Sequence, residues 1–239
     1  TLQGSVVTQN TSFAIGTVSN QTATWTMLRG TNVIAVDGSS RTLLGNAPGS
    51  RGVVVASGSS TVWSNSGLLT IGMNGSGSQM IVSNGATVRC SACTFGAFPG
   101  NATNNSAWVT DPGSRWLSSG DVYLGENGGN NLLVVSNGGL ATFQSASLGG
   151  SAFSLGNRLI VTGSNSVWST SGPLFLGVNG ASNQFLLANG ASALTSGGVL
   201  GSGAGSSNNV AIVSGDGSVW SNPASLIVGE AGSGNRLIV

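Results

Sequence analysis

Short apolar runs, each closed by a glycine, recur along the chain and form its strongest pattern. Each run has the length and composition of a short β-strand, and glycine-rich turns follow it. The closing glycines lie 24 to 29 residues apart, and long and short intervals alternate. The clearest of them are Gly45, Gly72, Gly96, Gly125, Gly149, Gly177, Gly201 and Gly229.

A second series of positions recurs at a constant interval, where a polar residue opens an apolar run. Ser78 begins this series, and from Asn105 onward every step is 26 residues. Because one series keeps a constant step while the other alternates, the alternation reflects loop lengths, and the number of residues per coil is constant. The asparagines of the series are Asn105, Asn131, Asn157, Asn183, Asn209 and Asn235.

Tryptophan marks every second coil, at intervals of 53, 52 and 52 residues: Trp63, Trp116, Trp168 and Trp220. The full sequence repeat is therefore a pair of coils. Each coil is expected to hold three short strands: one that ends at the glycine, one that follows the asparagine, and one around the Val-Trp-Ser segment.

A coil of this size cannot bury its own apolar face, but stacked coils can. The sequence therefore predicts an all-β, single-stranded parallel β-helix (β-solenoid) of about nine coils of about 26 residues. One domain is expected over residues 1–239, with regular coils over 17–239. Glycine-rich turns are expected to join the strands, and they include Asn-Gly pairs, where positive φ costs little, at Asn74, Asn84, Asn127, Asn137, Asn179 and Asn189.

The recurring asparagines are expected to form a structural ladder, in which side-chain amides hydrogen-bond from coil to coil. The alternative is a repeated polar stripe that binds glycan or ice. The tryptophans are expected to form an aromatic stack inside the coils, packed over Phe143 or Leu194 of the intervening coils. Their alternative role is a row of exposed platforms for sugar rings.

Charge is scarce, at 5% of residues and a net charge of +1, and all seven basic residues are arginine. No basic patch favours nucleic acid or an anionic membrane surface. The longest apolar runs hold about five residues, far fewer than the roughly 20 needed to insert into a bilayer. Thr1 begins a polar stretch that lacks the features of a signal peptide, which predicts a mature chain or an excised piece.

Candidate catalytic groups are few and scattered. The chain has no histidine or lysine for a catalytic triad or dyad, and its six acidic residues are dispersed over several coils. We therefore expect no enzyme activity, no cofactor and no metal. Cys90 and Cys93 have the spacing of half a zinc or redox motif without a second half, so a local disulfide or two core thiols is expected.

The segments 209–221 and 226–235 resemble the β-helical repeats of bacterial autotransporter passenger proteins, and the same pattern recurs at 123–131 and 174–183. The resemblance covers nearly the whole chain after Thr42. It implies a right-handed parallel β-helix that is exported and displayed or released outside a bacterial cell. Adhesion, aggregation and surface coating are the roles that the resemblance implies.

The two ends suggest an assembly. The chain ends within a coil at Leu237, Ile238 and Val239, and residues 1–16, which include Val6, Phe13 and Ile15, have the pattern to complete such a coil. The sequence predicts a head-to-tail homopolymer in which residues 1–16 of one copy complete the last coil of the next.

The predicted function is that of a non-catalytic extracellular structural protein, either a filament subunit or an adhesive rod at the bacterial cell surface. Its expected partners are further copies of itself and cell-surface glycans. Two alternatives stay open: a carbohydrate-binding β-helix module, and a fragment of a longer autotransporter-like adhesin passenger.

Overall fold

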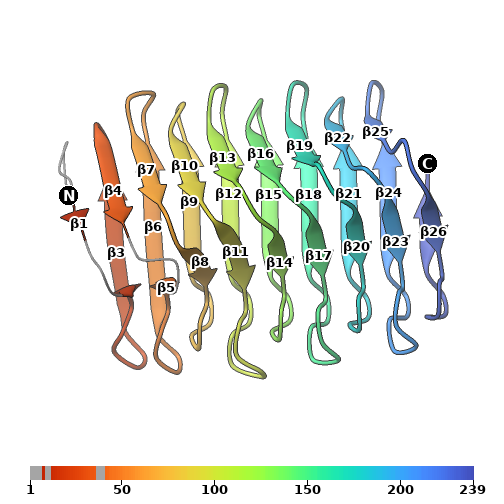
Figure 1. The fold of residues 1–239 in the computed structure, drawn as a ribbon, viewed down its shortest axis with the longest axis horizontal. Helices are drawn as coiled ribbons and strands as arrows, with labels where there is room; N and C mark the ends of the chain where they lie inside the picture. Colours follow the sequence, from red (N-terminus) through yellow and green to blue (C-terminus); the bar gives the residue numbers. More distant parts are fainter. Residues whose placement is uncertain (1–6, 9–11, 36–40) are drawn as a thin grey trace.

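The computed structural model describes residues 7–8, 12–35 and 41–239, and every regular element in them is a β-strand. The strands form three parallel sheets of nine strands each, so the chain makes about eight full turns (Figure 1). Each strand pairs with the strand three places further along the chain. The predicted parallel β-solenoid with three strands per coil is confirmed.

Sheet A holds the strands that follow a recurring polar residue, which is asparagine from Asn105 onward. They are β3 (Thr22–Met27), β6 (Arg51–Ser57), β9 (Gln79–Ser83), β12 (Ser106–Thr110), β15 (Leu132–Ser136), β18 (Arg158–Thr162), β21 (Gln184–Ala188), β24 (Val210–Ser214) and β27 (Arg236–Ile238).

Sheet B holds the strands that carry the repeated tryptophan. They are β1 (Val7–Thr8), β4 (Thr31–Ala35), β7 (Val62–Asn65), β10 (Thr87–Cys90), β13 (Arg115–Ser118), β16 (Leu140–Phe143), β19 (Val167–Thr170), β22 (Ser192–Leu194) and β25 (Val219–Ser221).

Sheet C holds the strands that end just before the closing glycine. They are β2 (Phe13–Ile15), β5 (Arg41–Leu44), β8 (Leu68–Ile71), β11 (Ala92–Phe95), β14 (Val122–Leu124), β17 (Ala146–Leu148), β20 (Leu174–Leu176), β23 (Gly198–Leu200) and β26 (Leu226–Val228).

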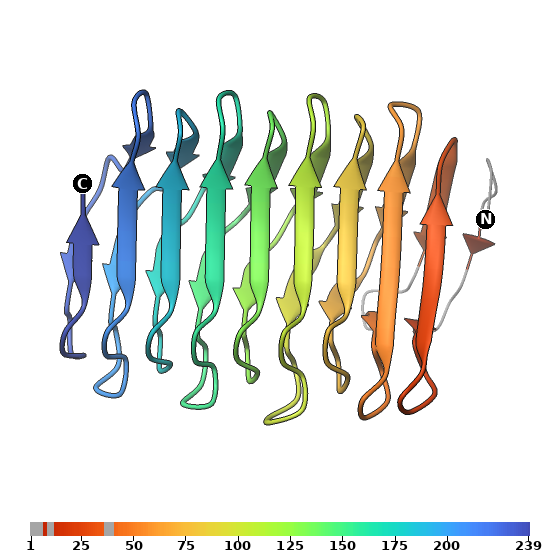
Figure 2. The same ribbon diagram turned by 180° about the vertical axis from the view of Figure 1, so that it is seen from behind.

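The winding is right-handed, as Figure 2 shows. In this view sheet A lies in front and its strands run upward. The chain then crosses over at the top and descends behind, while it advances from the N label at the right to the C label at the left. This is the hand that connections between parallel strands almost always take.

The core is a column of side chains that runs along the axis of the solenoid. Along each strand every second side chain points inward, and the parallel register places inward residues of successive coils directly above one another. In sheet C one such column is at most 1% exposed throughout and consists of Leu44, Ile71, Phe95, Leu124, Leu148, Leu176 and Leu200.

The six Asn-Gly pairs divide into two structural classes, and only three of their asparagines adopt positive φ. Asn84, Asn137 and Asn189 have φ between 51° and 58° in the short turns after sheet A. At Asn74, Asn127 and Asn179 φ is not positive. There the following glycine is required by close packing, because a Cβ on Gly128, for example, would overlap the carbonyl oxygen of Ala102.

Candidate functional site

The six recurring asparagines lie one above another at the corner where each coil enters sheet A. The Oδ1 atom of each of the last five, Asn131 to Asn235, accepts two hydrogen bonds from the asparagine one coil earlier, one from its backbone N–H and one from its Nδ2 atom. All ten of these distances are between 2.8 and 3.0 Å. The side chains from Asn105 to Asn209 are at most 1% exposed, so the ladder lies inside the fold and offers no polar stripe to a ligand.

The ladder continues beyond the asparagines at both ends. The backbone N–H of Ser78 donates to Oδ1 of Asn105 at 2.9 Å, and the Oγ atom of Ser78 accepts from the N–H of Gly52 at 3.2 Å. At the other end Nδ2 of Asn235 donates to the carbonyl oxygens of Ser206 and Gly232. Each buried amide therefore finds a partner, which keeps the cost of burying it low.

The closing glycines and the asparagine ladder depend on each other. Gly125 has φ +79°, and a Cβ on it would overlap the side-chain amide of Asn157. The same holds for Gly72 with Asn105 and for Gly177 with Asn209. The ladder amide thus occupies the space that a side chain would need, which explains why the two repeated positions occur together.

The tryptophans lie in one inward column of sheet B, where they alternate with small residues. Ala141, for example, pairs in register with Trp116 of the preceding coil and with Trp168 of the following coil. From β7 to β25 the column consists of Trp63, Val88, Trp116, Ala141, Trp168, Ala193 and Trp220. The repeat of two coils is therefore an alternation of large and small side chains, which allows rings much wider than the spacing between coils to fit.

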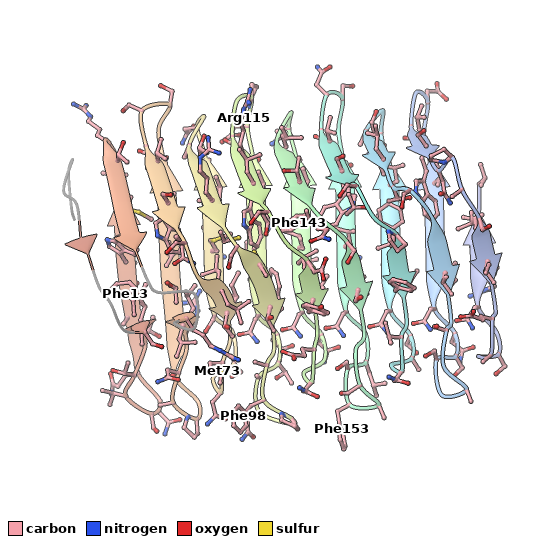
Figure 3. The ribbon with its side chains drawn as sticks, viewed as in Figure 1. Phe13, Met73, Phe98, Arg115, Phe143 and Phe153 are labelled. Carbon is pink, nitrogen blue, oxygen red and sulfur yellow. The ribbon has the colours of Figure 1, made fainter. Side chains whose placement is uncertain are left out.

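Phe143, which is labelled in Figure 3, contacts two of the tryptophans from the neighbouring inward position. Its ring centroid lies 5.3 Å from that of Trp116 and 4.9 Å from that of Trp168. The expectation that Leu194 plays the same part is wrong, because its side chain points outward and is 45% exposed; the inward residue there is Ala193. Trp63, Trp116 and Trp168 are at most 1% exposed, so no sugar ring can reach their faces.

The two cysteines are free thiols in the core, at the corner between β10 and β11. Nε1 of Trp116 donates a hydrogen bond to Sγ of Cys90 at 3.2 Å. Burial raises the pKa of the Cys93 thiol well above its ordinary value. A buried thiol with a raised pKa is a poor nucleophile and a poor metal ligand, so Cys93 acts as a core side chain.

Several acidic residues hold turns together. One carboxylate oxygen of Asp121 accepts from both the N–H and the Oγ atom of Ser145, and a carboxylate oxygen of Asp111 accepts from the N–H of Asn84. Burial and the nearby Asp121 raise the pKa of Tyr123. Within residues 7–8, 12–35 and 41–239 no three side chains of the metal-binding types come together.

The two ends of the solenoid each present an apolar hollow. At the first coil a cavity of about 600 Å³ is lined by Phe13, Ile15 and Trp25, among others. At the last coil one of about 340 Å³ is lined by Trp220, Leu226, Leu237 and Val239, among others. Of the predicted junction residues, Phe13 and Ile15 already pair with β5 of the same chain, Ile238 and Val239 are exposed, and Val6 lies outside the described residues.

Sequence reasoning missed one repeated feature, the outward column of sheet A. The signal for it was present in runs such as Leu159-Ile160-Val161, where three consecutive apolar residues replace the alternation expected of a strand with one face in water. The middle residue of each such run points away from the core. No helix long and apolar enough to cross a bilayer occurs in the described part of the chain.

One curated protein provides a sequence match, the adhesin BmaC autotransporter of Brucella suis biovar 1 (strain 1330). It is 28% identical over 143 residues, which is 58% of this chain but only 4% of that adhesin. No family model matches the chain. No solved structure matches it either.

The sequence match and the observed fold agree. The weak similarity to an autotransporter adhesin and the β-solenoid of three sheets fit a β-helical repeat protein of the autotransporter passenger type.

Proposed function

We propose that this chain is a non-catalytic structural rod of an adhesin, displayed outside a bacterial cell. The observation that carries the proposal is the uninterrupted stack of three sheets, in which the asparagine ladder and the inward columns repeat from coil to coil. Such a stack resists bending and holds whatever it carries at a distance. The similarity to an autotransporter adhesin supports the location and the role.

A bead assay tests the adhesive role. Beads coated with the purified chain are expected to bind bacteria or host cells more than beads coated with an unrelated β-solenoid, and periodate treatment of the cells reports whether glycans are the partner. Equal binding of both kinds of bead would contradict an adhesive role and favour a purely structural rod.

The finer proposal is that copies of the chain stack head to tail. The first strand of each sheet, β1, β2 or β3, and the last, β25, β26 or β27, present open edges, one from every sheet at either end. Open edges pair readily with further strands. Apolar hollows at both ends add core surface that a second copy would cover.

Electron microscopy at rising protein concentration tests this stacking. The intact chain is expected to form filaments, whereas removal of residues 1–16 or the substitution Leu226→Arg, at the edge of the last coil, is expected to leave short rods. The control is Leu194→Arg, which changes an outward leucine of similar exposure that lies one strand inside the terminal strand of sheet B. Short rods in every sample would contradict stacking and favour a segment of a longer adhesin.

A further inference from the structure

The outer face of sheet A carries a continuous stripe of large apolar side chains. Every coil from β6 to β27 contributes one residue, and the register places each directly beside the next. We call this set the sheet A stripe: Val55, Ile81, Trp108, Val134, Ile160, Leu186, Ile212 and Ile238. The first seven are partly exposed, and Ile238 is 44% exposed.

The stripe runs along sheet A from β6 to β27, whereas the central outward column of sheet C is continuously apolar only over its last three strands, at Phe175, Val199 and Ile227. The equivalent central outward column of sheet B is mostly polar, with Ser64, Arg89, Leu117, Thr142, Ser169, Leu194 and Ser221. Strands that are apolar on both faces are typical of parallel sheets that are covered on both sides. Sheet A therefore has the residue pattern of a covered sheet, and a contiguous apolar face of this size usually marks an interaction surface.

The two borders of the stripe differ in chemistry. Arg51, Arg158 and Arg236 lie on the border where the strands of sheet A begin. The other border, where the strands end, carries mainly hydroxyl groups, which include Thr110 and Ser136. None of the residues in the nine described strands of sheet A is acidic.

The area of the stripe suits a pairing between two rods. Seven steps of about 4.8 Å along the axis, and strands of five residues at about 3.3 Å each, give a face of roughly 34 by 17 Å. Two such faces together bury about 1,100 Å², just above the roughly 1,000 Å² that a specific interface needs.

We infer that the sheet A stripe is a lateral docking surface for a second copy of this chain. The two rods lie side by side with their axes parallel, because this arrangement sets the arginine border of each against the hydroxyl border of the other. An antiparallel pair would bring the two arginine borders together. Two flat faces with the same spacing between side chains pack closely, as sheets do at about 10 Å separation.

The composition of the stripe favours another copy over a polysaccharide. Seven of its eight side chains are aliphatic and only Trp108 is aromatic, whereas sugar rings stack on aromatic faces. An aliphatic face is best covered by another aliphatic face. Lateral pairing goes beyond the proposed head-to-tail stacking, since it uses the side of the rod and closes at two copies.

Sedimentation equilibrium of the intact chain against matched variants tests the inference. The variant Val134→Glu/Leu186→Glu places two charges on the stripe, and the control Thr142→Glu/Leu194→Glu places two charges on sheet B in the same two coils. All three are compared in the Leu226→Arg background, which blocks end-to-end stacking. The protein with an unchanged stripe and the control are expected to reach twice the mass of one chain, while the stripe variant keeps the mass of a single chain. Urea unfolding in dilute solution checks that both variants fold.

Cross-linking reports the direction of the two rods. Single variants Ile81→Cys and Ile212→Cys are treated with a short bismaleimide, which the buried Cys90 and Cys93 do not meet. A parallel pair is expected to link each variant to itself. An antiparallel pair would link only a mixture of the two, which would overturn the proposed arrangement.

The outcomes separate this inference from end-to-end stacking, because lateral pairing doubles the width of the particles in micrographs and stacking changes their length. A single-rod mass for the intact chain at all concentrations would overturn the inference. So would a stripe variant that pairs as well as the intact chain. A third result would also overturn lateral pairing: the intact chain stays single and binds a polysaccharide or lipid vesicles, and the stripe variant does not bind them.

Discussion

At the scale of the residue, asparagine and glycine form one interlocking unit. The asparagine of one coil supplies the acceptor for two donors of the preceding coil, and its amide fills the space above the glycine that closes an earlier strand. Neither residue type can change alone, because a smaller polar residue leaves buried donors unpaired and a larger residue than glycine collides with the amide. This mutual dependence gives the sequence its two most regular positions.

The ladder predicts a large cost for Asn157→Ala. The substitution removes the Oδ1 acceptor of the N–H and Nδ2 groups of Asn131, and each buried unpaired donor costs about 1–3 kcal/mol. Urea unfolding is expected to show a clearly lower midpoint. Asn179→Ala is the control, since Asn179 is exposed and its Nδ2 atom makes a single surface hydrogen bond to Gly150; equal losses for both would contradict a stabilising ladder.

Because the amide of Asn157 lies so close to Gly125, substitution by alanine should reduce stability by different amounts at two glycines of nearly equal φ. Gly125→Ala meets both an unfavourable φ of +79° and the amide of Asn157, whereas Gly113→Ala has φ +82° and its nearest neighbour, a Cα atom, at 3.6 Å. Backbone strain alone costs on the order of 1 kcal/mol. Gly125→Ala should therefore lower the unfolding midpoint further, and the loss should shrink when Asn157 is also replaced by alanine, as a double-mutant cycle measures.

At the scale of the element, the strands of sheet B fit together because large and small residues alternate between coils. Coils stack about 4.8 Å apart, which leaves no room for two indole rings in adjacent coils at the same inward position. Ala141 and Ala193 provide the space beside Trp168, and Phe143 fills the remainder from the next inward position. The strands of the repeat are thus not interchangeable one by one.

This packing predicts that Trp168→Ala strongly destabilises the solenoid. Removal of a fully buried ring leaves a cavity and costs about 3–5 kcal/mol. The control is Trp108→Ala on the outer face of sheet A, measured at a dilution where rods are single, and its effect should be smaller by several fold. Thermal and urea unfolding followed by circular dichroism measure both, and similar losses would contradict the inward placement.

At the scale of the whole molecule, the structural unit is one coil but the packing unit is a pair of coils. A solenoid in which each repeat contacts only its neighbours should tolerate the loss of whole packing units. The asparagine ladder has one coil as its period, and the tryptophan column has two. Deletion of an even number of coils should therefore preserve the packing, whereas deletion of an odd number should disrupt it.

Two deletions test whether the number of removed coils must be even. Deletion of residues 132–183 removes two coils, joins Asn131 to Gln184 and sets Trp116 beside Ala193, so the chain is expected to fold into a rod about 10 Å shorter. Deletion of residues 132–157 removes one coil and sets Trp116 beside Trp168. That chain should unfold at a much lower urea concentration, and equal stability of the two would contradict the pair as the packing unit; small-angle scattering measures their lengths.

Much of this architecture follows from periodicity. The constant step from Asn105 to Asn235 and the glycine that closes each sheet C strand were sufficient to predict three strands per coil and stacked coils. The asparagine ladder followed from the same step, since equal spacing on a stacked coil brings equivalent residues together. The inward column at Leu194 was misplaced by one residue, because alternation along a strand of three residues gives too short a pattern to decide which side faces the core.

Sequence by itself determined the repeat, the three sheets and the scarcity of catalytic groups, because these depend on which residues recur and at what interval. Only the tertiary structure decided what each repeat does. Register placed Ala141 between Trp116 and Trp168, close packing separated two classes of identical Asn-Gly pairs, and the direction of each side chain placed Ile160 and its equivalents outside. These are contacts between coils, and a linear pattern cannot specify a contact until the coils are stacked.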